Sequence, residues 1–228
     1  MVERLGRTTW TDHWAPTRRP LLVVPIGSCE QHGPHLPLDT DTRIAMVLAE
    51  GLVGRYEAGE LMVTPPVTIT ASGEHAAFPG TLSVGSTVME QYIIELVRSA
   101  DWSAGVVLVN GHGGNHSAVD SAVRLLLTEH RRVLSWWPRV EGGDAHAGDT
   151  ETSIMLAIAP ELVHMERAAA GATAPLADLI DAMREGGVRA VSENGVLGDP
   201  RRATAHHGRM VLTKLGLDLF AAVDEWWE

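Results

Sequence analysis

Two short, unbroken apolar runs constrain the fold of this chain more than any other feature. They occupy residues 20–27 (PLLVVPIG) and 104–111 (AGVVLVNG), and each ends at a glycine. Apolar runs of this length are typical of strands that are buried on both faces, as in parallel sheets. We therefore predict two central strands here. Two weaker strand candidates lie at residues 60–69, which two prolines interrupt, and 131–137.

Helical periodicity fills most of the segments between these runs. Apolar residues recur at helical spacing in residues 42–56, 86–102 with Ser86 as the N-cap, 117–130, 150–159, 174–187 and the last stretch of the chain. Strands that alternate with helices favour an α/β fold with a largely parallel sheet covered on both faces. In such a sheet a functional site lies beyond the carboxyl ends of the strands, where two polar, glycine-rich segments follow Pro25 and Val109.

Charge and cysteine content argue against several kinds of partner. The 228 residues carry a formal net charge of −11, so the phosphate backbone of a nucleic acid would be repelled. A single cysteine cannot form an internal disulfide, which favours a reducing compartment. The first residues lack the apolar segment of a signal peptide, and no apolar run approaches the length of a membrane span. We expect a cytoplasmic protein without nucleic-acid or membrane partners, folded as one domain over residues 1–228.

The segment CEQHGPHLPLDTD contains the first candidate site. Alternate side chains of an extended backbone share a face, so Glu30 and His32 can converge on one point. Asp41 stands at the start of a helical pattern, where the chain can return to that point. Glutamate, histidine and aspartate suit a divalent metal such as Zn, Mn or Fe, although a solvated loop with a capping aspartate would show the same residues. By the same alternation Cys29 points away, and we interpret it as a small buried residue behind the site.

Two further segments carry histidines and acids. In NGHGGN, His112 stands between glycines at the end of a central strand, which favours a metal ligand over an anion-binding helix N-terminus. In DAHAGDTETS, His146, Asp149 and Glu151 lead into a helix. This third segment is a weak signal by itself, since histidines and acids are common in glycine-rich loops. With the other two it would supply a further carboxylate and a histidine for proton transfer.

The motifs PIGSCEQHGPHLPLDTD, GEHAAFPGT, NGHGGN and HAGDTETS together resemble the creatininase family of metal-dependent amidohydrolases. The resemblance implies a three-layer α/β/α sandwich, two divalent metal ions per subunit, of Zn with Fe or Mn, and a homo-oligomer. It also implies residue roles. Glu30, His32, Asp41 and His112 fall on the family's metal ligands, with Asp41 as the bridging carboxylate, and His146 falls on the histidine beside the scissile amide.

One position departs from the family pattern. In creatininases proper the residue two after the second-motif histidine is an acidic metal ligand, whereas here it is Gly114. The ion held by His32 and the shared Asp41 would then lack a ligand. We predict that Glu151 supplies it, with Asp149 as the runner-up. The departure also argues against creatinine as the substrate.

The longer stretches LDTDTRIA, SGEHAAFPGTLSVG and VSENGVLGDPRRATA look most like a branch of the family that trims a small ribosomally made precursor peptide during redox-cofactor biosynthesis. The resemblance implies a peptidase that releases a short C-terminal fragment from the modified precursor. A hydroxide held between two metals would attack the amide carbonyl, and His146 would protonate the leaving nitrogen. Ser72, Glu74 and His75 are candidates for substrate binding, unless their loop only shapes the wall of the pocket.

Two alternatives stay open. One is a hydrolase of a small cyclic amide or a formamide. The other is a metal-stabilised oligomeric binding protein without turnover. The proton-transfer role of His146 weighs against the second alternative, because a purely structural metal site needs neither an open position nor a proton donor.

Overall fold

A parallel four-stranded sheet forms the centre of the structure, a computed structural model that describes residues 3–13 and 19–227. The strands are β1 (Leu21–Ile26), β2 (Leu61–Val63), β3 (Gly105–Asn110) and β4 (Val133–Trp136), and their order in the sheet is β2-β1-β3-β4. All three strand pairs are parallel. β1 and β3 are buried along their whole length, as their unbroken apolar sequences predict.

The described part of the chain also forms six α-helices. They are α1 (Thr40–Val53), α2 (Gly85–Ser99), α3 (His116–Thr128), α4 (Asp149–Ile158), α5 (Leu176–Gly186) and α6 (Ala205–Trp227). Of these, α5 lies beyond the end of the sheet. Short 3₁₀ turns lie at Leu5–Arg7, Trp10–His13, Gly73–His75, Gly113–Asn115, Pro160–Leu162, Met165–Arg167, Val188–Ala190 and Pro200–Arg202. None of the described helices combines the length and the apolar character needed to cross a membrane.

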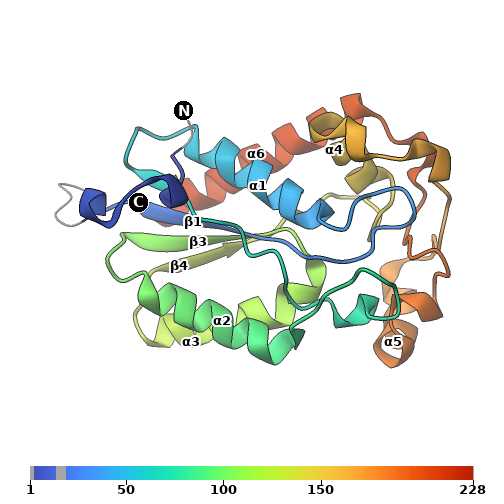
Figure 1. The fold of residues 1–228 in the computed structure, drawn as a ribbon, viewed down its shortest axis with the longest axis horizontal. Coiled ribbons are helices and arrows are strands. Elements are labelled where there is room, and N and C mark those ends of the chain that lie inside the picture. Colours follow the sequence, from blue (N-terminus) through green and yellow to red (C-terminus); the bar gives the residue numbers. More distant parts are fainter. Residues whose placement is uncertain (1–2, 14–18, 228) are drawn as a thin grey trace.

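The side chains of β1 show how the layers are built. Leu21 and Val23 pack in a hydrophobic cluster with α1, α4 and α6. Leu22 and Val24 pack in a second cluster with α2 and α3. Because successive side chains of a strand point to opposite faces, the two clusters lie on opposite sides of the sheet. Figure 1 shows α1 and α6 above the strands and α2 and α3 below them, so the predicted three-layer α/β/α sandwich is confirmed.

The neighbouring strands β1 and β3 send the chain to opposite faces of the sheet. The connection after β1 leads to α1 in one layer, and the connection after β3 leads to α3 in the other. The two connections therefore diverge at the carboxyl ends of adjacent strands, which is where open parallel sheets bind ligands. The two glycine-rich segments predicted to carry the site follow these two strands.

Two local predictions are wrong. The strand expected over residues 60–69 covers only β2, and the segment with Pro65 and Pro66 lies outside it, because proline has no N–H to donate to a strand ladder. Ser86 does not cap α2, which already begins at Gly85. The hydroxyl of Ser83 instead accepts a hydrogen bond from the Gly85 amide at 3.2 Å.

The end of β1 lies against the first turn of α1 with no room for a side chain between them. A Cβ on Gly27 would lie 2.2 Å from Thr42 Oγ1 and 2.3 Å from Thr42 Cα. The hydroxyl of Thr42 also donates a hydrogen bond to the Ser28 carbonyl at 3.1 Å. This contact sets the distance between the β1 loop and the residues of the first turn of α1, among them Asp41.

Gly27→Ala should therefore destabilise the protein, by about 1–3 kcal/mol as for other overpacked sites, because the backbone of α1 must move. Gly51→Ala is the matched control, since a Cβ there meets no atom within 4 Å and Gly51 lies in the same helix. We expect the control to be neutral or stabilising by up to ~1 kcal/mol. Urea unfolding of both variants measures the difference, and equal stabilities would contradict the proposed close packing.

Candidate metal centre

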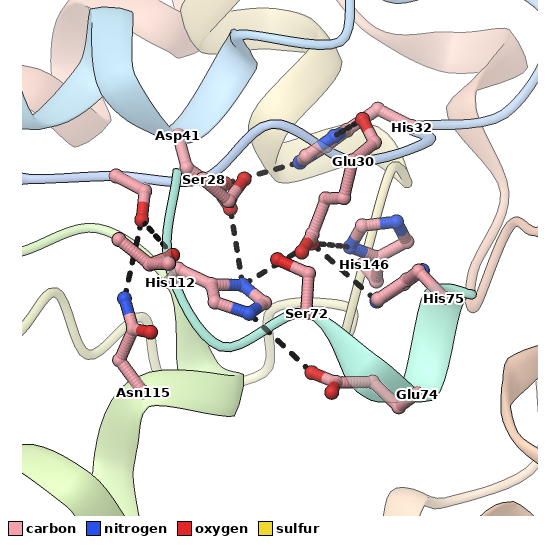
Figure 2. Close-up of polar contacts among 12 residues, drawn as sticks. Ser28, Glu30, His32, Asp41, Ser72, Glu74, His75, His112, Asn115 and His146 are labelled. Atoms are coloured by element: carbon pink, nitrogen blue, oxygen red, sulfur yellow. Dashed lines mark hydrogen bonds and ion pairs between the residues drawn. The ribbon is translucent and has the colours of Figure 1, made fainter. Parts of the chain in front are cut away.

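Acids and histidines from four segments of the chain, all buried except the half-buried Glu151, meet beyond β1 and β3. Glu30 and His32 come from the loop after β1, Asp41 from the first turn of α1, His112 from the end of β3 and Glu151 from the first turn of α4. Figure 2 shows Glu30, His32, Asp41 and His112 pointing toward one another. The structure thus brings together all five residues that the sequence analysis proposes as metal ligands.

One group consists of Glu30, Asp41 and His112. His112 Nδ1 lies 3.1 Å from Glu30 Oε1 and 3.1 Å from Asp41 Oδ2. The Asp41 carboxylate also accepts a hydrogen bond from the Ser28 hydroxyl at 2.8 Å. The potential ligand atoms of the three residues lie within 4.8 Å of one another, close enough to bind one ion.

The second group consists of His32, Asp41 and Glu151. His32 Nε2 lies 3.0 Å from Asp41 Oδ1 and 3.9 Å from Glu151 Oε2. The two carboxylate oxygens of Asp41 therefore face different histidines, His32 and His112. An aspartate in this position can bridge two ions, one in each group.

Asp149, the runner-up for the missing ligand, is directed elsewhere. Its Oδ2 atom lies 2.8 Å from His207 Nδ1, and it belongs to none of the metal-sized groups in the described part of the chain. Glu151 is directed to the site by a local turn. Ala147 has a left-handed backbone, with φ of 53°, and its amide donates a hydrogen bond to Glu151 Oε2 at 2.6 Å.

The charges of the two groups are buried together, and they shift the pKa values of their neighbours. Burial alone would lower the pKa of His32, but the Asp41 carboxylate beside it raises that pKa to about 10. Burial also opposes the charge on His112, yet Glu30 and Asp41 raise its pKa well above the usual value. For Glu151 burial is the largest influence, and it raises the pKa to about 7.

Glu30 provides the test of whether a cation fits this cluster. Its side chain is fully buried, and among the described residues its carboxylate oxygens have ion-pair neighbours such as His112 but accept no hydrogen bond of normal geometry. A buried carboxylate without hydrogen bonds is costly unless a positive charge compensates it. The surrounding imidazole nitrogens and carboxylate oxygens are ligands of divalent transition metals, which would displace the protons from His32 and His112. The residues therefore fit a divalent metal site.

Two more histidines, His75 and His146, face Glu30 from the other side. His146 Nδ1 lies 3.9 Å and His75 Nε2 3.4 Å from Glu30 Oε1. Burial lowers the pKa of His75, and it lowers the pKa of His146 well below the usual value, so both rings are neutral near pH 7. Each ring belongs to a further metal-sized group, His146 with Glu30 and His32, and His75 with Glu30 and Glu74.

The residues proposed for substrate binding fall in two different environments. Glu74 and His75 line a cavity of about 650 Å³ that also contains the metal-site residues Asp41, His112 and Glu151. Ser72 is fully buried, and its hydroxyl has no hydrogen-bond partner among the described residues. Cys29 is half-buried rather than buried, and its thiol contacts the Gly80 carbonyl at 3.7 Å. It belongs to none of the metal-sized groups found within residues 3–13 and 19–227.

Asn115, for which the sequence suggested no role, joins the segments of the site through hydrogen bonds. Its side-chain amide donates hydrogen bonds to the Gly27 carbonyl at 3.1 Å and to Asn110 Oδ1 at 3.0 Å, and accepts one from the Ala71 amide at 3.1 Å. Asn115 is thus bonded to the loop after β1, to β3 and to the loop that carries Glu74. Asn115 is the last residue of the NGHGGN motif, and this position could have indicated its role in the site.

Gly114 lies against two residues of the site. A Cβ at this position would lie 2.0 Å from Glu74 Oε1, 2.4 Å from His112 Nε2 and 2.7 Å from the Ala71 carbonyl oxygen. The Glu74 carboxylate lies close to His112, with its Oε1 atom 3.4 Å from His112 Nε2. The absence of a side chain at Gly114 therefore leaves the room that the Glu74 carboxylate and the His112 ring occupy.

Comparison with known proteins gives consistent matches over most of the chain. The family model Creatininase, described as creatinine amidohydrolase, matches residues 6–223. The mycofactocin precursor peptide peptidase of Mycolicibacterium smegmatis is 48% identical over 215 residues, which cover 92% of this chain and 87% of that protein. The peptidase of the same name from Mycobacterium tuberculosis is 46% identical, over 99% of this chain and 92% of its own length. The creatinine amidohydrolase of Pseudomonas putida is 27% identical, over 72% of this chain and 74% of its own.

Solved structures share the fold at lower sequence identity. A structure titled "Creatininase Mn" matches with a TM-score of 0.83 and 23% identity, and the match covers 99% of this chain and 98% of that chain. A crystal structure of creatinine amidohydrolase matches with a TM-score of 0.82 and 22% identity, over 98% of this chain and 97% of its own. At this identity the likeness supports the three-layer architecture and nothing finer.

Gly114→Ala should weaken metal binding, because the Glu74 tip can move but the His112 ring and the Ala71 backbone cannot move without disturbing the site. We expect about 10–100-fold lower metal affinity, as for other changes beside metal ligands. Gly113→Ala is the matched control, since a Cβ there meets no atom within 4 Å. Competition with a chelator measures both variants. Equal affinities for the two would show that the space at Gly114 does not matter.

Proposed function

Since the chain belongs to the creatininase family, we propose that it is a metal-dependent peptidase that acts on the precursor peptide of mycofactocin. It would release a short C-terminal fragment from the modified precursor. The choice of substrate is supported by relatives of 45–48% identity that carry this name and match over most of the chain. The chemistry is supported by the observation that Asp41 presents its two oxygens to two different histidines, each in a group that can hold an ion.

We assign two divalent ions to the two groups, Zn with Fe or Mn. Glu30, Asp41 and His112 would hold one ion, and His32, Asp41 and Glu151 the other. When bound, such ions polarise an amide carbonyl and lower the pKa of water. The chain's own task is to hold these ligands close together and away from water, which the shared burial of Glu30 and Asp41 supports. Binding of the ions would displace the protons from His32 and His112.

His146 is the residue we assign to proton transfer. Its ring lies on the wall of the cavity, neutral because burial lowers its pKa, with Nδ1 directed toward Glu30. A neutral imidazole can take the proton of the attacking water and pass it to the leaving nitrogen, so that atoms and charge balance over the cycle. Ser72, Glu74 and His75 would contact the substrate, Ser72 only if its loop moves, because its hydroxyl is fully buried.

The cavity favours a peptide over a small cyclic amide. Its volume of about 650 Å³ lies within the range of roughly 300–1,000 Å³ that holds drug-sized ligands, which leaves room for several peptide residues. Leu176, Ile180 and Met183 of α5 form an apolar part of its wall. A second cavity of about 540 Å³ shares Ala145, Leu176 and Leu197 with the first, so an extended chain could continue beyond the metal centre.

We also propose that residues 1–228 form one metallohydrolase domain that acts in the cytoplasm, where ribosomal precursor peptides are made, and that it self-associates. Exposed apolar side chains support the last point. Val88 and Tyr92 lie one turn apart on α2, and Leu82 and Val84 precede the helix, all with more than a third of their surface exposed. A second copy of the chain would cover such a surface.

Incubation of the metal-loaded protein with a mycofactocin-type precursor peptide, plain and modified, tests the proposed function. We expect mass spectrometry to detect a short C-terminal fragment and the shortened precursor. Creatinine and a formamide are incubated in parallel. An intact peptide under conditions in which either small amide is hydrolysed would rule out the proposed substrate.

His146→Ala should lower turnover by about 10²–10⁴-fold, the usual contribution of a proton-transfer group, and leave bound metal nearly unchanged. Glu30→Ala should lose metal and activity together, because Glu30 is common to three of the four metal-sized groups among the described residues. Metal analysis and peptide cleavage are measured on the same samples. Loss of metal from His146→Ala would make His146 a ligand instead, which its distance from Glu30 and His32 permits.

A further inference from the structure

Gln31 lies between two proposed metal ligands in the sequence, and its side chain reaches both histidines that face Glu30. Its Nε2 atom is 2.7 Å from His75 Nδ1 and 3.0 Å from His146 Nε2. The residue is 95% buried, so these contacts form away from water. Neither the metal groups nor the proton-transfer step described above uses Gln31.

The neighbouring backbone fixes which end of the Gln31 amide faces the histidines. The Gly33 amide donates a hydrogen bond to Gln31 Oε1 at 2.8 Å, and an N–H can only donate. Gln31 Nε2 donates to the Gly195 carbonyl at 3.0 Å, and a carbonyl can only accept. Gly195 packs so closely that a Cβ there would lie 1.9 Å from Gln31 Oε1. The side-chain amide is therefore held in one orientation, with its nitrogen rather than its oxygen toward His75 and His146.

The hydrogen-bond donors and acceptors around His75 and His146 determine which ring nitrogen of each carries the proton. His146 Nε2 lies 2.8 Å from the backbone carbonyl oxygen of Gln31, which only accepts, so this nitrogen carries the proton of the neutral ring. The two hydrogens of Gln31 Nε2 are then available for the Gly195 carbonyl and for His75 Nδ1. His75 Nδ1 accepts one of them, and the proton of this ring is on Nε2.

We propose that Gln31 is a positioning residue that fixes the tautomers of His75 and His146, so that the two rings present opposite hydrogen-bonding groups to the metal centre. His75 turns an N–H toward Glu30, with its Nε2 atom 3.4 Å from Oε1. His146 turns an unprotonated Nδ1 toward the same carboxylate at 3.9 Å. One ring is thus a proton donor and the other a proton acceptor.

This division suits the hydrolysis of an amide, and to that extent the inference rests on the proposed function. The unprotonated Nδ1 of His146 can accept the proton of the attacking water and pass it to the leaving nitrogen. The N–H of His75 can donate a hydrogen bond to a carboxylate or to an oxygen that gains negative charge. With the opposite tautomers, His75 would turn a lone pair toward the Glu30 carboxylate and His146 could not accept a proton on this side.

The test is the tautomeric state of His75 in zinc-loaded protein with ¹⁵N-labelled histidine, measured by NMR in the wild type and in Gln31→Glu. A carboxylate of the same shape has no hydrogen to give, so His75 should move its proton to Nδ1 in the variant. We expect kcat for the precursor peptide to fall about 10–100-fold, as for other residues that orient groups at a metal centre, with KM and bound metal nearly unchanged. Gln91→Glu, an exposed change on α2, is the control and should behave as wild type.

Two results would overturn the inference. One is a wild-type spectrum in which His75 carries its proton on Nδ1. The other is a Gln31→Glu variant that keeps both the wild-type tautomer and the wild-type kcat. The wild-type spectrum alone shows which nitrogen of His75 carries the proton, even if the variant does not fold. This measurement needs no substrate. If the proposed peptide substrate is wrong, the NMR spectrum will still show the inferred tautomers. If the inferred tautomers are wrong, the wild-type protein can still cleave the peptide.

Discussion

The site depends on one backbone contact, the close approach of the first turn of α1 to the end of β1. Gly27 permits it, because any side chain there would run into Thr42. The contact places Asp41 between His32 from the loop after β1 and His112 from the end of β3. The two histidines come from adjacent strands whose connections leave the sheet on opposite faces, so a single aspartate at this point reaches both. The placement of Asp41 between two histidines thus follows from sheet topology together with one glycine.

Much of this could be predicted from the sequence, because the informative residues lie directly at the ends of strands. The unbroken apolar runs of β1 and β3 predicted the sheet, and the polar residues that follow them had to meet at its edge. The prediction that the side chains of Glu30 and His32 converge on one point assumed that side chains alternate strictly along an extended backbone. The structure agrees with this prediction for these two residues. Alternation did not reveal Gln31, for which the sequence suggested no role. The backbone after β1 is irregular, and the Gln31 side chain reaches His75 and His146.

Other features could not be inferred from spacing, because they depend on how distant segments pack. The choice between Asp149 and Glu151 depends on His207, 58 residues later in the chain, which contacts Asp149. The fully buried Ser72 lies in a loop whose burial depends on the segments packed around it, and no local pattern reveals this. Asn115 is a similar case, since its bonding partners come from three segments.

The histidines of the site fall into two classes that the surrounding charges separate. His32 and His112 lie beside Asp41, and the carboxylates raise their pKa values despite burial. His75 and His146 lie farther from compensating charge, and burial lowers their pKa values. In many active sites, residues of one type have different pKa values because their surroundings differ. The residues then take different roles, some binding charge and others transferring protons. Here the first pair suits metal ligation, and the neutral second pair suits proton transfer by His146 and hydrogen-bond donation by His75.

The central claim is that Asp41 joins two metal sites. Metal content per chain after reconstitution with zinc and removal of excess ion, in wild type and Asp41→Asn, tests it most directly. The account predicts two ions per chain in the wild type and the loss of both in the variant, since each group would be reduced to one carboxylate and one histidine. A wild type that holds only one ion, or an Asp41→Asn variant that keeps two, would contradict it.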